Sequence, residues 1–113
     1  MTVKAPPKEH YPSIQAMVSS AINSYWQQTG SFNEESIFMA IKAYFEREEE
    51  YWIARVQELE QGKLPLITIE GLEEARLKVR KIKWILLKGE PFMRSKIQQY
   101  LLNRAKAKRE INH

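Results

Sequence analysis

The chain has 113 residues, of which 43% are hydrophobic and 28% are charged, and it contains no cysteine. This length predicts one domain with one compact core. The lack of cysteine excludes disulfides, thiolate zinc sites, iron–sulfur clusters and cysteine nucleophiles. Apolar runs such as residues 84–87 are far shorter than the roughly 20 residues of a membrane-spanning helix. Residues 1–8 lack the apolar region of a secretory signal, so we expect a cytoplasmic protein without a membrane partner.

The net charge of +4 is unevenly divided along the chain. Residues 1–62 contain five Lys or Arg against nine Glu, whereas residues 63–113 contain 13 Lys or Arg against five Glu. This division predicts an anionic partner for the basic half, or a second copy that brings the acidic half. The alternative is neutralisation between helices of one molecule.

Glycine and proline mark the ends of the expected helices. Gly30, Gly62 and Gly89 follow long helix-compatible stretches and suit a helix C-terminus. Pro12 and Pro91 suit a first helical turn, where the missing N–H has no acceptor. The expected helices span residues of about 12–29, 33–61, 69–88 and 91–109. They form a single helical domain, 12–109, between an extended tail, 1–11, and a short C-terminal tail, 110–113.

The first segment carries an apolar residue every three or four positions, which is typical of a helix with one buried face. Its apolar residues are Ile14, Met17, Val18, Ala21, Ile22, Tyr25 and Trp26.

The second segment begins at Asn33, a good N-cap, with Glu34 and Glu35 at the positive end of the helix dipole. A helix of some 27 residues is roughly 40 Å long, more than a small bundle needs, so it projects, kinks near residues 46–50 or pairs with another chain. Its apolar stripe is Ile37, Ile41, Tyr44, Tyr51, Trp52 and Leu59.

Two charged residues, Glu48 and Arg55, fall within that stripe. Because a buried charge is costly unless paired, they either meet partners on facing helices or mark the point where the helix leaves the core. The neighbouring run of Glu46, Glu49 and Glu50 could supply paired carboxylates for catalysis, but a solvated helix face explains it as well.

The third segment is capped by Thr68, and its core stripe is Leu72, Ala75, Val79, Ile82 and Leu86. Trp84 lies opposite that stripe, and a tryptophan among cations can stack on a base while the cations hold phosphates. The alternative is that Trp84 and Leu77 pack against a second neighbouring helix. The expected nucleic-acid-binding residues of this segment are Arg76, Arg80, Lys81, Lys83, Trp84 and Lys88.

The fourth segment follows a tight connection, residues 89–91, of the length seen in helix-turn-helix units. Arg94 and Lys96 lie near its N-terminus, where side chains can reach base edges in a major groove. Its apolar stripe is Met93, Ile97, Tyr100 and Leu101, and the same face turns polar at Arg104. The further expected nucleic-acid-binding residues are Arg104, Lys106, Lys108 and Arg109.

Catalytic motifs are lacking. The sequence has no G-x-S-x-G elbow and no glycine-rich phosphate loop, and His10 and His113 lack metal-ligand spacing. We therefore expect no enzyme activity, no catalytic residues, no metal and no cofactor.

Together these patterns predict an all-α fold of about four helices in a small antiparallel bundle with a long second helix. The leading hypothesis is a non-enzymatic basic protein that binds nucleic acid, DNA or RNA, or serves as an accessory subunit of a nucleoprotein complex. The alternative is a protein-protein interaction subunit whose long second helix and exposed apolar residues dock on a partner protein or on another copy.

Overall fold

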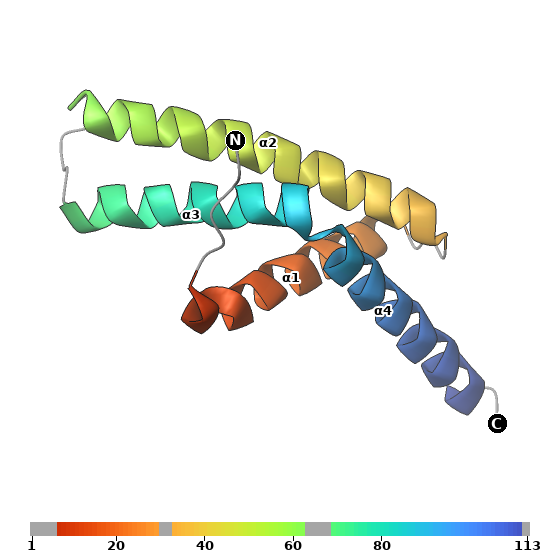
Figure 1. Ribbon diagram of the computed structural model, residues 1–113. Helices are drawn as coiled ribbons and strands as arrows, with labels where there is room; N and C mark the ends of the chain where they lie inside the picture. The colour runs from red at the N-terminus through yellow and green to blue at the C-terminus, as the bar shows by residue number, and fades with distance from the viewer. Residues whose placement is uncertain (1–6, 30–32, 63–68, 112–113) are drawn as a thin grey trace.

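The computed structural model describes residues 7–29, 33–62 and 69–111, and all regular structure in them is helical. A 3-10 turn, η1, spans Lys8–His10 and leads into α1, Tyr11–Thr29. The other helices are α2, Glu34–Glu60, α3, Ile69–Lys88, and α4, Glu90–Ile111 (Figure 1). The predicted all-α fold with a long second helix is confirmed. The helical region extends further at both ends than the predicted 12–109, and Gly30 and Thr68 lie outside the described residues.

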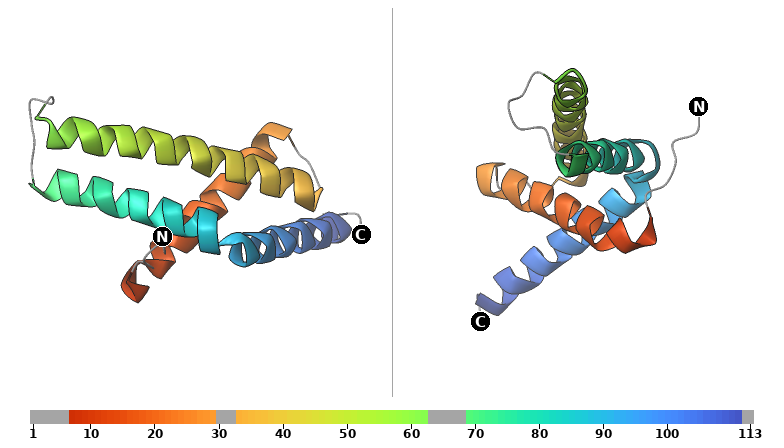
Figure 2. Two further views of the ribbon diagram at one scale, coloured as in Figure 1. Left: turned by 45° about the horizontal axis from the view of Figure 1, so that its top comes forward. Right: turned by 90° about the vertical axis from the view of Figure 1, so that its left-hand side faces the viewer.

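Helices α2 and α3 lie side by side and antiparallel, forming a long hairpin (Figure 1). Helices α1 and α4 cross near one end of this hairpin, and its other end extends beyond them (Figure 2). The molecule is accordingly elongated, with extents of 59 × 29 × 23 Å. The long second helix therefore projects as one unbroken helix, without a kink at residues 46–50.

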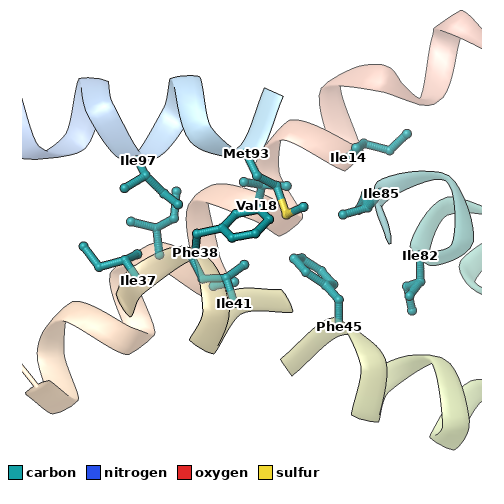
Figure 3. Close-up of a cluster of buried hydrophobic side chains, with 12 residues drawn as sticks. Ile14, Val18, Ile37, Phe38, Ile41, Phe45, Ile82, Ile85, Met93 and Ile97 are labelled. Atoms are coloured by element: carbon teal, nitrogen blue, oxygen red, sulfur yellow. The ribbon is translucent and has the colours of Figure 1, made fainter. Parts of the chain in front are cut away.

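The hydrophobic core lies where the four helices meet. Figure 3 shows its side chains converging from every helix. Each large apolar side chain removed from water contributes roughly 1.5 to 3 kcal/mol, so this cluster is the main stabilising contact. Its buried members are Ile14, Val18, Ala21 and Ile22 of α1, Ile37, Phe38, Ile41 and Phe45 of α2, Ile82 and Ile85 of α3, and Met93 and Ile97 of α4.

The buried face of α2 is rotated relative to the predicted stripe. Phe38 and Phe45 are buried, whereas Tyr44 and Tyr51 are 40% and 57% exposed. The exposed arc suits tyrosine because it leaves the phenol hydroxyl accessible to water. The predicted stripe of α3 similarly omitted Ile85, which is fully buried.

Glu48 and Arg55 mark the place where α2 passes beyond the core. Glu48 Oε2 accepts a hydrogen bond of 3.1 Å from Trp52 Nε1, and Arg55 lies 3.9 Å from Glu58. These partners belong to α2 itself, not to a facing helix. The pKa of Tyr44 is raised because its side chain is partly removed from water, and its hydrogen bond to Glu48 adds to that rise.

Local capping sets where the helices begin and end. The Asn33 side chain accepts a hydrogen bond of 2.8 Å from the Ser36 backbone N–H, as predicted for an N-cap. Gly62 follows α2 with a φ of 68°, the left-handed conformation that favours glycine.

Gly89 joins α3 to α4 at a point where no side chain fits. Its N–H donates to the Ile85 carbonyl at 2.9 Å, and its own carbonyl accepts from Met93 N–H at 2.8 Å. A Cβ at this position would lie 2.6 Å from the Ile85 oxygen and 2.9 Å from the Ile85 Cα. Both are backbone atoms, so only a shift of the chain could make room.

We expect Gly89→Ala to lower the melting temperature, with a loss of about 1 to 3 kcal/mol typical of overpacking, although alanine is the better helix former. Thermal unfolding followed by circular dichroism measures this. Ser95→Ala, at an exposed position of α4, is the control and should change stability by less than about 0.5 kcal/mol. An unchanged or raised melting temperature for Gly89→Ala would contradict the close approach.

Candidate nucleic-acid interface

The structure places the expected nucleic-acid-binding residues in different environments. Arg76 and Arg94 are ion-paired with carboxylates of the same molecule. Trp84 is packed against the core. Lys83, Lys88 and Lys106 are exposed, Arg80, Lys81 and Lys96 are half-buried, Arg104 lies on an aromatic ring, and the side chains of Lys108 and Arg109 lie outside the described residues.

Arg94 is the centre of an ionic cluster at the N-termini of α2 and α4. Its Nη1 donates to Glu34 at 3.2 Å and to Glu35 at 3.0 Å, and its Nη2 lies 3.5 Å from Glu90. Its guanidinium also lies 4.1 Å from the centre of the Phe38 ring. The hydrogen bond to Glu35 is the main cause of a raised pKa of Arg94. With these partners, Arg94 is positioned to hold α4 against α2.

Arg76 makes the second inter-helical ion pair, with Nη2 2.8 Å from Glu60 Oε1. Both side chains are about half exposed, so water and salt screen the pair. For Arg76 and Arg94, neutralisation within one molecule therefore accounts for the charge.

Trp84 packs against α1, which corresponds to the alternative interpretation of its position. Its ring is stacked on Tyr11, with centroids 5.8 Å apart and planes inclined by 25°. It also lines an apolar cleft of about 230 Å³ with Ile14 and Phe92. The preceding turn of α3 holds Lys81, whose pKa is lowered by burial and, to a lesser extent, by the charge of Lys78.

A polar groove of about 290 Å³ runs between α1 and α4. Helix α1 contributes Ser19 and Asn23 on exposed positions one turn apart, above the buried Ile22. Helix α4 contributes side chains from four positions of one face, so the two helices present amide, hydroxyl and ammonium groups to the same space. The α4 residues are Lys96, Gln99, Tyr100 and Asn103.

An aromatic and cationic cluster lies at one end of this groove. The Arg104 guanidinium lies 4.7 Å from the centre of the Trp26 ring and 5.7 Å from that of Tyr100. Trp26 and Tyr100 meet edge to face, with centroids 5.8 Å apart. Stacking on Trp26 orients the Arg104 fork without neutralising its charge.

Several groove residues were missed by the sequence analysis. Trp26 and Tyr100 were assigned to apolar stripes, and Asn23, Gln99 and Asn103 were not singled out. Lys96, Gln99, Tyr100 and Asn103 follow the spacing i, i+3, i+4, i+7, which indicates a polar helix face. The sequence does not show that Ser19 and Asn23, some 80 positions earlier, face the same space.

Within the described residues, no group of three or more His, Cys, Asp or Glu side chains is arranged to hold a metal ion. Of the helical segments that the structure describes, none combines the length and the apolar character of a membrane span.

We expect Arg94→Gln to lower the free energy of unfolding measurably, because it removes the charge-assisted hydrogen bonds that join α4 to Glu34 and Glu35 of α2. Arg76→Gln is the matched control and should cost less than about 1 kcal/mol, since its single pair is more exposed. Urea unfolding of both variants measures the difference. Equal losses would show that the Arg94 cluster does not hold α4 in place.

We expect Trp84→Ala to lower stability by about 2 to 4 kcal/mol, somewhat below the cost for a fully buried tryptophan. Affinity for an oligonucleotide, measured under folding conditions, should stay unchanged. Tyr51→Ala, at an exposed aromatic position, is the control for both measurements. A weaker affinity with unchanged stability would instead assign Trp84 to base stacking.

The comparisons with known proteins found no match. No family model fits the chain, and neither a curated protein nor a solved structure is significantly similar to it. The groove between α1 and α4 and the cations beside it are therefore the basis for a functional assignment.

Proposed function

We propose that this protein is a non-enzymatic nucleic-acid-binding protein whose contact surface is the groove between α1 and α4. The observation that carries the proposal is the composition of the groove. Its wall contains the Lys96 ammonium, three side-chain amides, a serine hydroxyl and Tyr100, and none of its described lining residues is a carboxylate. A polyanion can therefore approach the groove without being repelled by a negatively charged side chain in its lining.

The residues divide into groups that suit different parts of a nucleic acid. Lys96 and Arg104 lie about two turns apart on α4, and the exposed Lys106 lies in the same turn as Arg104. These cations are suited to phosphates. The amides of Asn23, Gln99 and Asn103 both donate and accept hydrogen bonds, so they suit base edges or sugar hydroxyls. We place Lys108 and Arg109 along the same helix by sequence only.

Tyr100 favours a single-stranded segment over a duplex. Its side chain is half-buried and lines the groove, so an unpaired base entering the groove can stack on the accessible part of the ring. A paired base keeps its ring faces inside the duplex stack. Lys88 of α3 supplies additional positive charge in this proposal, while Trp84 has a packing role.

The test is binding of a fluorescent single-stranded oligonucleotide, followed by anisotropy at several salt concentrations. We expect the double variant Lys96→Gln/Arg104→Gln to weaken binding at low salt by at least about tenfold. The slope of log affinity against log salt should also fall by about 0.7 for each phosphate that the variant no longer binds. Lys8→Gln/Arg47→Gln removes two exposed cations from the acidic half and should change neither value appreciably.

Two further variants locate the binding surface. Tyr100→Leu should weaken binding by roughly the 1 to 3 kcal/mol of one stacked base, with the salt slope unchanged. Lys83→Gln/Lys88→Gln removes the same number of charges from α3 and should have a smaller effect than the α4 pair. The proposal fails if the wild type shows no affinity at low salt, or if the acidic-half control weakens binding as much as the groove variant does.

A further inference from the structure

The α2–α3 hairpin has an apolar seam that continues beyond the core. Leu59 and Ala75 are buried there, 8% and 2% exposed, but they are not part of the four-helix cluster. Two helices alone can bury only the stripe between them, so any further apolar side chain on the hairpin stays partly in water.

On one face of the hairpin, partly exposed apolar side chains form one row along α2 and a second row along α3. We name this face the open hairpin face. Ile53, Val56 and Val79 are half-buried and line a groove of about 250 Å³ together with Gln57 and Arg76. The described lining of this groove comes from α2 and α3 alone. With spacing of three or four residues, the open hairpin face consists of Glu49, Ile53, Val56 and Glu60 on α2 and Leu72, Arg76, Val79 and Lys83 on α3.

The two rows have opposite charge around the same apolar centre. The α2 row places a glutamate at each end of an apolar pair, and the α3 row alternates apolar and basic residues. Within one molecule the rows already attract each other, since Glu60 and Arg76 form an ion pair of 2.8 Å. A surface with acid on one side and base on the other is complementary to itself.

We propose that a second copy of this chain docks on the open hairpin face, so that the acidic row of each copy lies opposite the basic row of the other. A twofold axis parallel to the hairpin produces this arrangement and a four-helix bundle with antiparallel neighbours. An axis perpendicular to the hairpin would place acid on acid and base on base. Charge therefore selects the first arrangement.

The proposed interface also pairs acidic residues of the first half of the chain with basic residues of the second half. Arg76 and Lys83 of α3 face the partner's carboxylates, while the cations of α4 stay at the groove between α1 and α4. This inference does not depend on the proposed nucleic-acid function, because docking is measured without nucleic acid.

The first test is the mass in solution, by analytical ultracentrifugation of the full chain at high micromolar concentration. We expect twice the monomer mass of 13.4 kDa. Glu49→Lys and Lys83→Glu should each raise the dimer dissociation constant by about tenfold, since symmetry makes each substitution act twice. Mixing the two variants should restore association, because every opposed pair is then again of opposite charge. Glu58→Lys, an equal charge change at an exposed position off this face, should have little effect.

The second test distinguishes the two arrangements by cross-linking, in a chain that has no cysteine of its own. A short bismaleimide should link E49C to K83C when the two single variants are mixed. It should link neither variant to itself efficiently. A monomeric wild type, equal effects of Glu49→Lys and Glu58→Lys, or preferential linking of E49C to E49C would each overturn the proposal.

Discussion

Burial of apolar side chains where all four helices meet governs the architecture of this protein. Phe38 and Phe45 of α2 contribute the largest rings to that cluster. Because the cluster occupies only one end of the hairpin, α1 and α4 must cross there, and the other end projects (Figure 1). The groove between α1 and α4 and the open hairpin face both result from this placement of the core.

Two local features keep α4 at the angle that forms the groove. Gly89 lets the backbone of the α3–α4 junction approach Ile85 more closely than any side chain would allow. Arg94 then connects α4 to the N-terminus of α2 through the carboxylates of Glu34 and Glu35 and through the Phe38 ring. An arginine near the start of a basic helix suggests a ligand contact, but here its partners are internal. Basic residues therefore differ in role according to whether carboxylates of the same molecule reach them.

Helix number, helix type and most of the core followed from periodicity, because a buried helical face repeats every three or four residues. The N-cap at Asn33 and the buried Ile14, Val18, Met93 and Ile97 are examples. The buried arc of α2 was less predictable. Its N-terminal half touches several helices, so Phe38 and Phe45 are buried in addition to one narrow stripe. The pairing of Trp84 with Tyr11 was equally unpredictable, since it joins positions 73 residues apart.

The all-helical fold, the excess length of α2 and the opposite charges of the two halves follow from the sequence alone, since these depend on composition and short-range spacing. Which cations are neutralised internally, and which line a groove, depends on the packing of the helices in three dimensions. The same packing makes Ser19 and Asn23 face Lys96 and Gln99. Contacts between helices that are distant in sequence depend on the angles at which the helices cross. These angles are set by the packing of the whole core, and no local sequence pattern specifies that packing.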